Sequence, residues 1–326
     1  MPLILKPLTL DELRAAWPDL QNTLKAPHPF VLPEWLNAWW GSFEGGEELF
    51  LRAVICDDEI IGIAPLRIGK NIARFIGSAD VCDYLDFMIK PETERDFYSV
   101  VLDGLTMVGV KVLELESLRP DSSVIKHLVP LALLKGNSVQ VVDTDVTLEM
   151  ELPVTWQGYL AALTNHQRHE TGRKLRRLEE SGNIQFDIKP LENMEDDLAT
   201  LIRLLRISRT DKAMFMTEKM EEFFKRLAGA MLRTGLLRFG HLRLRDTIVA
   251  SIMCFDYNGT RYLYNSGYDP EFSSLSVGLL SKVLSIKDAI EQKMIKYDYL
   301  KGAEVYKYHL GGKEMPISTA RIELAK

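Results

Sequence analysis

Residues 262–300 read YLYNSGYDPEFSSLSVGLLSKVLSIKDAIEQKMIKYDYL. The stretch predicts a strand, a small polar loop, an amphipathic helix over 277–292 and a short strand over 296–300. The loop ends in Ser273, Ser274 and Ser276, directly before the helix. Backbone N–H groups at a helix start have no intrahelical partners and carry the positive end of the dipole. The pattern therefore predicts either a phosphate site at this helix start or a serine-capped helix without a ligand.

The residues before this stretch predict helices followed by a three-stranded antiparallel meander. Strands are expected over 236–244, 248–257 and 260–266, with Asn258-Gly259 as a strong hairpin signal between the last two. Helical patterns precede them over 156–181, 194–208 and 218–232. The second half of the chain therefore combines helices with a mostly antiparallel sheet.

The first half repeats this order of elements. Pro33 begins a predicted helix, strands 49–56 and 60–68 form a hairpin, and a helix over 92–108 precedes a strand over 110–117. Residues 58–64 (DEIIGIA) resemble residues 246–252 (DTIVASI), at the same place in each half. A strand over 139–152, closed by Pro153, separates the halves. We expect an α+β fold in two copies, 1–152 and 153–326, each with a mixed, mostly antiparallel sheet flanked by helices.

Composition excludes several classes of protein. The 326 residues are 46 % hydrophobic and 26 % charged, with a net charge of -6, which excludes a disordered or fibrous protein. No run approaches the length of a membrane-spanning helix, and residues 1–10 lack an export pattern, so a cytoplasmic protein is expected. The three cysteines support neither a disulfide framework nor a zinc site, and His166 and His169 have no third ligand in view. We therefore expect no metal.

The two halves differ in charge. Residues 1–150 carry 13 Lys and Arg against 23 Asp and Glu, whereas residues 151–326 carry 27 against 23. A basic helix in the second half contains Arg168, Arg173, Lys174, Arg176 and Arg177. This helix is interpreted either as a solvated face or as a rim for a polyanionic ligand. The charge is too low for a partner such as duplex DNA.

Several segments of the chain together resemble one family. The chain is similar to the BioF2-like acetyltransferase domain family of the GNAT superfamily, which is related to the Fem aminoacyltransferases. The likeness is continuous over about 155–310 and looser before that. It is carried by residues 262–272 (YLYNSGYDPEF), 275–278 (LSVG), 297–302 (YDYLKG), 304–307 (EVYK), 173–178 (RKLRRL) and the opening segment 30–40.

The resemblance implies two tandem GNAT-like units and an acyl-CoA cosubstrate, acetyl-CoA or a longer one. With these ligands, the basic helix would serve as a rim for the phosphates of CoA, an acyl carrier protein or a tRNA acceptor end. In such folds pantetheine runs beside a splayed central strand and pyrophosphate lies at the following helix start. Only Gly278 remains of the glycines usual in that loop. The cofactor-binding residues implied by this match are Tyr264, Asn265, Ser266, Gly267, Ser276, Val277, Gly278 and Leu279.

Acyl transfer to an amine requires polarisation of the thioester carbonyl, removal of an ammonium proton and protonation of the thiolate. Backbone N–H groups of 265–267 are candidates for the polarisation. Asp298 and Glu304 are the candidate bases, and Tyr297, Tyr306 and Tyr268 the candidate acids. Lys307 is a candidate to stabilise negative charge. Because the resemblance centres on 304–307, Tyr306, Lys307 and Asp298 are expected to be catalytic, with Tyr268, Arg168, Arg173 and Arg177 binding substrate.

The sequence therefore predicts a GNAT-type N-acyltransferase. Its expected acceptor is an amine of a small molecule or of a cell-envelope precursor. Two alternatives stay open: a Fem-like transferase that uses aminoacyl-tRNA, and a non-catalytic binding module on the same fold. The first half is expected to be structural, because it is acidic and lacks the Ser/Gly loop before a helix.

Overall fold

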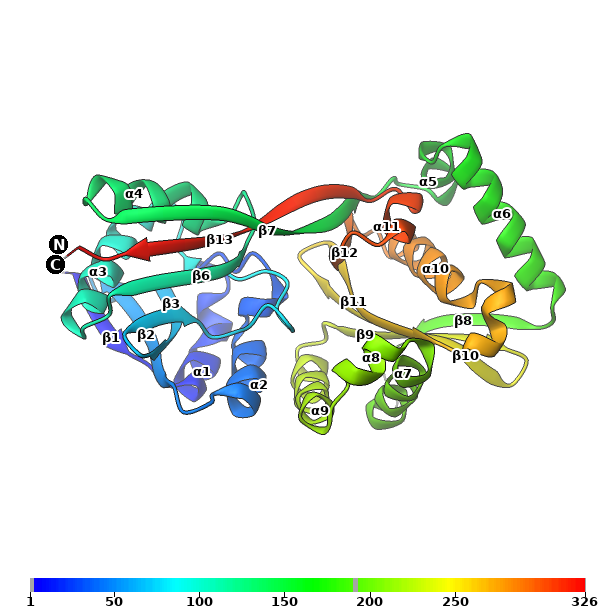
Figure 1. Cartoon of the computed structure of the whole chain (residues 1–326), viewed down its shortest axis with the longest axis horizontal. Coiled ribbons are helices and arrows are strands. Elements are labelled where there is room, and N and C mark those ends of the chain that lie inside the picture. The colour runs from blue at the N-terminus through cyan, green and yellow to red at the C-terminus, as the bar shows by residue number, and fades with distance from the viewer. Residues whose placement is uncertain (1–2, 190–192, 326) are drawn as a thin grey trace. The chain divides into compact units, whose positions relative to one another are not determined.

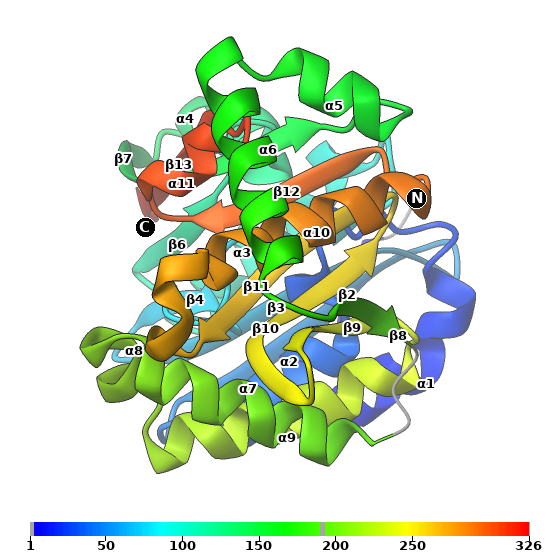
Figure 2. The same cartoon turned by 90° about the vertical axis from the view of Figure 1, so that its right-hand side faces the viewer.

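The computed structural model describes residues 3–189 and 193–325. These residues form two compact units, Met1–Asp145 with Met315–Lys326, and Val146–Glu314 (Figures 1 and 2). Each unit contains a mostly antiparallel sheet with helices packed on it. The mixed, mostly antiparallel α+β fold expected from the sequence is confirmed.

The first unit has the sheet order β1-β2-β3-β4-β6-β13, in which β4 and β6 are parallel. Its predicted hairpin corresponds to β2 and β3, and the helix predicted at Pro33 begins at that residue. Its elements are β1 (Leu3–Pro7), α1 (Leu10–Leu20), η1 (Pro29–Val31), α2 (Pro33–Phe43), β2 (Glu48–Cys56), β3 (Glu59–Gly69), β4 (Ile72–Phe75), β5 (Met88–Ile89), α3 (Glu94–Met107), β6 (Val112–Leu118), η2 (Val124–Leu128), α4 (Val129–Leu134) and the beginning of β7 (Ser138–Glu151).

The second unit has the sheet order β8-β9-β10-β11-β12-β7, in which β11 and β12 are parallel. Its predicted meander is confirmed as β9, β10 and β11. Its elements are the end of β7, α5 (Trp156–Ala162), α6 (Asn165–Glu180), β8 (Ile184–Lys189), α7 (Met194–Ser208), α8 (Thr210–Phe215), α9 (Glu218–Arg233), β9 (Leu237–Leu244), β10 (Thr247–Tyr257), β11 (Thr260–Tyr268), η3 (Pro270–Leu275), α10 (Val277–Glu291), β12 (Lys296–Lys301), α11 (Val305–His309) and the beginning of β13 (Lys313–Glu323).

The two units repeat one pattern. The five strands β1-β2-β3-β4-β6 correspond in order and direction to β8-β9-β10-β11-β12. In both, the turn that carries the sequence likeness, at residues 57–58 and 245–246, joins the second and third of these strands. In both, a helix lies in the chain between the two strands that pair in parallel. The expected duplication is therefore present in the topology.

The sixth strand is β13 in the sheet of the first unit and β7 in the sheet of the second. Residues Thr147–Glu151 of β7 pair with β12 in the second unit, and residues 318–323 of β13 pair with β6 in the first. The sequence placed the boundary between residues 152 and 153 and gave all later residues to the second domain. The compact units divide the chain differently, at residues 145/146 and 314/315, because these strand pairings hold the segments.

The helical pattern of 156–181 forms two helices rather than one. The break lies at Leu163 and Thr164, where Thr164 caps α6 in a capping box with Gln167. Gly158 and Gly172 both lie inside helices. The sequence pattern did not predict the short helix α8 and the edge strand β8. The short α8 carries Lys212, and Arg209 lies directly before it; both line the pocket described below.

A buried arginine fixes α10 against the hairpin of β10 and β11. The Arg261 guanidinium donates two hydrogen bonds to Asp256, at 2.7 and 2.8 Å, and a third to Asp288 of α10. Arg261 is fully buried, and the Asp256 side chain is nearly so. A buried charge with both carboxylates in hydrogen-bond contact holds a defined geometry. The start of α10 is thereby set beside the end of β11.

Candidate active site

The two parallel strands of the second unit separate partway along their length. Their pairing runs over three residue pairs, from Thr260↔Lys296 to Tyr262↔Asp298, although β11 continues to Tyr268. A β-bulge in the pairing of β10 with β11 falls at Tyr264, directly after the separation. Bulges bend a strand and re-aim its side chains. Beyond this point the end of β11 faces α10, α8 and the segment before α11 across a pocket.

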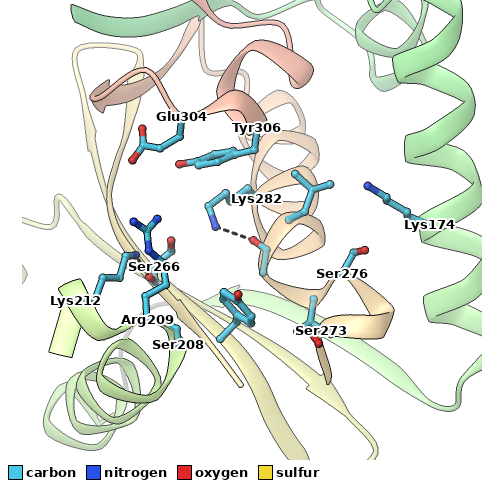
Figure 3. A pocket seen from close by; sticks show the side chains of 14 residues that line it. Lys174, Ser208, Arg209, Lys212, Ser266, Ser273, Ser276, Lys282, Glu304 and Tyr306 are labelled. Atoms are coloured by element: carbon cyan, nitrogen blue, oxygen red, sulfur yellow. Dashed lines mark hydrogen bonds between the residues drawn. The ribbon is translucent and has the colours of Figure 1, made fainter. Parts of the chain in front are cut away.

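The pocket has a volume of about 340 Å³ (Figure 3). Four of its lining side chains are basic and one is acidic. It is lined by Lys174, Ser208, Arg209, Lys212, Ser266, Tyr268, Ser273, Ser276, Val277, Gly278, Leu279, Lys282, Glu304 and Tyr306.

The start of α10 forms one side of the pocket. Ser276 precedes the helix in the left-handed conformation, with φ of 55°, and the first turn carries no acidic residue. The Tyr268 ring packs so closely on this turn that a Cβ at Gly278 would lie 2.7 Å from it. Lys174 of α6 lies on the same side (Figure 3). Unpartnered N–H groups, the helix dipole and an ammonium together make this side suitable for a phosphate.

Lys282 lies one turn further along α10 and enters the middle of the pocket (Figure 3). Its residue is 7 % exposed, and its Nζ donates to the carbonyl oxygen of Gly278 at 2.7 Å. The Nζ also lies 5.0 Å from the centre of the Tyr306 ring. Burial, together with the charge of Lys212, lowers the pKa of the Lys282 ammonium to about 7. At neutral pH this group can therefore both release and accept a proton.

Lys212 and Arg209, from α8 and the residue before it, form the side opposite Lys174 (Figure 3). The Nζ of Lys212 donates to the carbonyl oxygen of Ser266, on β11. Burial, together with the charge of Arg209, lowers the pKa of Lys212 to about 8. The guanidinium of Arg209 makes two hydrogen bonds to Asp211, at 2.9 and 2.7 Å.

Glu304 and Tyr306 complete the lining above Lys282 in Figure 3. The carboxylate of Glu304 lies 2.9 Å from the Nζ of Lys307. Partial burial opposes ionisation of Glu304, but the hydrogen bond and charge of Lys307 outweigh it and lower the pKa of Glu304. Burial raises the pKa of the Tyr306 phenol. At neutral pH Glu304 is therefore an anion and Tyr306 a neutral hydrogen-bond donor.

The pocket brings together about half of the site residues that the sequence singled out. Five of the residues expected to be catalytic or to bind cofactor do not line it, as described next. Those that line the pocket are Tyr306, Tyr268, Ser266, Ser276, Val277, Gly278 and Leu279, together with the candidate base Glu304.

Lys307 and Asp298 are buried beside the pocket and do not line it. The Nζ of Lys307 donates to three consecutive carbonyl oxygens at the end of β12, those of Leu300, Lys301 and Gly302. Asp298 accepts a hydrogen bond from the N–H of Leu300 at 2.8 Å, in the same turn. The candidate acid Tyr297 is also buried, and its hydroxyl donates to Ser285. These side chains shape the strand end and hold Glu304.

Three residues of β11 expected to bind the cofactor make contacts within the protein. The Tyr264 ring packs against Phe224 and Phe255. The side-chain oxygen of Asn265 accepts the N–H of Ser266 at 2.9 Å, so that N–H is not free to polarise a carbonyl. A Cβ at Gly267 would lie 2.4 Å from the backbone nitrogen of Leu205, so this glycine allows α7 to approach the strand.

The basic helix contributes Lys174 rather than the arginines named as substrate ligands. Arg173 is paired with Glu170 at 2.9 Å, Arg168 donates to Asn165 at 2.7 Å, and Arg177 is exposed. None of these three lines the pocket. Sequence reasoning missed Lys282, although a lysine four residues after Gly278 and four before Ile286 lies on the apolar face of the helix. It also missed Lys212 and Arg209, because α8 was not predicted.

The part of the chain that the structure describes contains neither a metal-binding cluster nor a membrane-spanning helix. Within 3–189 and 193–325, no three His, Cys, Asp or Glu side chains are grouped so that they could hold a metal ion. Among the helices that the structure describes, none is both long and apolar enough to cross a membrane.

The sequence of the unit that holds the pocket matches a known family. Residues 165–308 match the acetyltransferase (GNAT) domain family, in its BioF2-like branch. This part of the chain is a GNAT acetyltransferase-family domain. The match covers α6 to α11 and thus every residue that lines the pocket. The resemblance expected from the sequence is confirmed.

Solved structures share the fold of the whole chain at low sequence identity. FemX superposes with a TM-score of 0.66 at 12 % identity, over 98 % of this chain and 97 % of its own. The C-terminal domain of a putative lysylphosphatidylglycerol synthetase from Agrobacterium fabrum gives 0.59 at 10 % identity, over 96 % and 92 %. A tandem GNAT protein from the clavulanic acid biosynthesis pathway, solved without AcCoA, gives 0.50 at 10 % identity, over 100 % and 99 %. No curated protein sequence matches the chain significantly. The GNAT fold, in tandem, therefore extends over the chain.

Proposed function

We propose that this GNAT domain moves an acyl group from acyl-CoA to an amine in the pocket between the separated ends of β11 and β12. The observation that carries the proposal is the position of Lys282. This buried ammonium, with its lowered pKa, lies between a side suited to phosphate and the carboxylate of Glu304. A pocket that offers a phosphate site, a proton donor and a carboxylate has the groups that acyl transfer to an amine requires.

The start of α10 and Lys174 are the groups that would hold the phosphates of the donor. When bound, acyl-CoA supplies an acyl group activated by a thiolate leaving group. The first unit, residues 1–152 in the sequence-based division, has a structural role in this proposal.

Residues of the pocket take part in the proton transfers that accompany acyl transfer to the amine. The amine approaches as an ammonium ion, which the Glu304 carboxylate attracts, and it loses one proton to water before attack. Attack forms the C–N bond and breaks the C–S bond. The departing sulfur takes up a proton from the Lys282 ammonium, and the nitrogen gives its second proton to the Lys282 amine, which restores the ammonium. Lys282 is the donor matched to this step, because an ammonium with a pKa of about 7 is a stronger acid than a free thiol. The Tyr306 phenol is a hydrogen-bond donor available to the substrates in the pocket. Lys307 and Asp298 act as positioning residues, because they hold Glu304 and the end of β12.

A thermal-shift titration with CoA, acetyl-CoA and a longer acyl-CoA tests the proposal. A ligand at 100 times its Kd stabilises the native state by about 2.7 kcal/mol, which raises the Tm by several degrees. We expect a saturable rise that Lys174→Met weakens. Arg173→Met is the matched control, since it removes the neighbouring charge outside the pocket, and it should leave the rise unchanged. No rise with any of the three ligands would refute donation by acyl-CoA.

The number of cations around the pocket also favours a second donor, an aminoacyl-tRNA. Four basic side chains line the pocket, and α6 carries further arginines beside it. A polyanion such as a tRNA acceptor end suits this charge, and the FemX likeness is consistent with it at the level of the fold. This alternative predicts salt-dependent tRNA binding and no response to acyl-CoA. Lack of response to both donors would favour a non-catalytic binding module.

A further inference from the structure

The basic side chains of the pocket form two groups on opposite sides. Lys174 and the start of α10 lie on one side, and Lys212 and Arg209 lie on the other, with Lys282 between them (Figure 3). The proposed function gives the first group to the donor phosphates. It leaves Lys212 without a role.

Lys212 forms no ion pair with a carboxylate among the residues that the structure describes. Arg209 is neutralised by its two hydrogen bonds to Asp211, and Glu304 is engaged by Lys307 at 2.9 Å. The hydrogen bond of Lys212 goes to the neutral carbonyl of Ser266. Withdrawing an ammonium from water without a carboxylate is unfavourable. A bound anion would remove that penalty, since an ammonium has three donors and this one uses one in the structure.

Lys212 shares its pocket with the only acidic lining residue. Glu304 attracts an ammonium, and its charge acts on Lys212 across the same space. A ligand that places its amine at Glu304 therefore has Lys212 within the same cavity. An amine without an acidic group would leave Lys212 without an ion-pair partner. An amine that carries an acidic group would place its ammonium at Glu304 and its anion at Lys212.

We infer that the acceptor is an amine that also carries an anionic group, a carboxylate or a phosphate, and that Lys212 binds this group. The inference rests on the proposed function, because it assigns the amine to the acceptor. It also gives the two sides of the pocket different tasks. The Lys174 side binds the donor, and the Lys212 side selects the acceptor.

Matched amines of increasing length test this assignment without an identified substrate. The probes are ω-amino acids from glycine to 6-aminohexanoate, each compared with the alkylamine of the same chain length at equal ionic strength. O-Phosphoethanolamine distinguishes a phosphate from a carboxylate. Binding is read as a thermal shift, and acetyl-CoA is titrated separately. The variants are Lys212→Met and Lys212→Arg, with Lys287→Met as control, since Lys287 lies exposed on α10 outside the pocket.

We expect at least one acidic amine to stabilise the protein where the alkylamine of equal length does not. Lys212→Met should weaken this binding about tenfold or more, the effect of losing a hydrogen bond to a charged group. Lys212→Arg should retain part of it, and Lys287→Met all of it. The acetyl-CoA shift should survive in Lys212→Met, which also shows that the variant is folded.

The outcomes separate the two proposals. If acetyl-CoA binds but acidic and neutral amines are equivalent, or if Lys212→Met binds acidic amines as well as the wild type, the assignment of Lys212 is wrong and acyl-CoA use stands. If acidic amines bind through Lys212 but acyl-CoA does not bind, the anion site is supported and the proposed donor is wrong.

Discussion

The parallel strand pairs β4–β6 and β11–β12 occupy equivalent places in the two units, but what lies beyond them differs. In the first unit the segment of residues 82–87 occupies the space where the strands end. Leu85 and Cys82 hydrogen bond to Ser117 at the end of β6, and the Phe87 ring lies 5.0 Å from that of Phe75 at the end of β4. In the second unit, the space beyond the pair is a pocket lined by serines and lysines.

The helices between these strands differ in charge at the turn that would face a ligand. The first turn of α3 carries Glu94 and Asp96, whereas the first turn of α10 carries no acid. Acidic side chains at a helix start satisfy the dipole from within the protein and repel phosphate. The same sheet topology therefore holds a filled aromatic core in the first unit and a pocket in the second. The difference depends on whether aromatic residues, or small and basic ones, follow the strand. The predictions below test whether this difference separates stability from activity.

The largest effect is expected for Lys282→Met. It removes the proposed proton donor, so acyl transfer, measured as thiol release from acetyl-CoA with an ω-amino acid acceptor, should fall about 10²- to 10⁴-fold. The acetyl-CoA thermal shift should remain. Lys287→Met, on the same helix, should keep full turnover, and a Lys282→Met variant that did so would exclude Lys282 as the donor.

The same variant should change the pH dependence of folding. The pKa of Lys282 falls from 10.5 in its ordinary state to about 7 in the folded protein. A lowered pKa means that Lys282 contributes stability above the unfolded pKa and that this contribution is lost as the pH falls toward 7. As the pH falls from 10.5 to 7, the free energy of unfolding of the wild type should therefore decrease relative to that of Lys282→Met, as measured by denaturant unfolding at each pH. Parallel curves for the two proteins would show that Lys282 is not desolvated.

A large stability effect is expected for Phe87→Ala in the first unit. The Phe87 ring contacts the rings of Phe75, Phe97 and Tyr98, and the residue is 1 % exposed. Its truncation should cost about 3–5 kcal/mol in the unfolding of this unit, because a cavity remains. The acetyl-CoA shift should be unchanged below the transition. Met107→Ala, at an 87 % exposed position of the same unit, is the control. Loss of acetyl-CoA binding in folded Phe87→Ala would argue against a structural first unit.

A smaller effect is expected for Gly267→Ala in the second unit. The added Cβ would meet the backbone of Leu204 and Leu205 at 2.5 and 2.4 Å, so α7 must move from β11. We expect a loss of about 1–3 kcal/mol in denaturant unfolding. Gly229→Ala in α9 is the matched control, since its Cβ would have room, and it should gain up to about 1 kcal/mol. Equal behaviour of the two variants would contradict the close packing at Gly267.

Sequence reasoning succeeded where the signal is local. The periodicity of residues 194–208 and the Asn258-Gly259 turn gave α7 and the β10–β11 hairpin, because helix periodicity and turn residues act over a few positions. It failed where contacts between distant segments determine which strands pair and which side chains line the pocket. The pairing of β13 with β6 depends on residues more than 190 positions apart, such as Ala320 and Leu115. Lys212 and Lys282 enter the pocket through tertiary packing, which the local pattern around a lysine does not reveal.

The use of β13 as the sixth strand of the first unit bears on how the chain folds during synthesis. The first unit needs residues 318–323 beside β6, so its sheet is complete only when almost the whole chain has been made. Until then, the edge of β6 offers unpaired N–H and C=O groups to other chains. In most multidomain proteins the N-terminal domain folds first, during synthesis. In this protein the first unit cannot complete its sheet in that order. The second unit, Val146–Glu314, is continuous in the chain and can complete its sheet before the first. Separate expression of residues 1–152 would yield a first-unit sheet with an open edge.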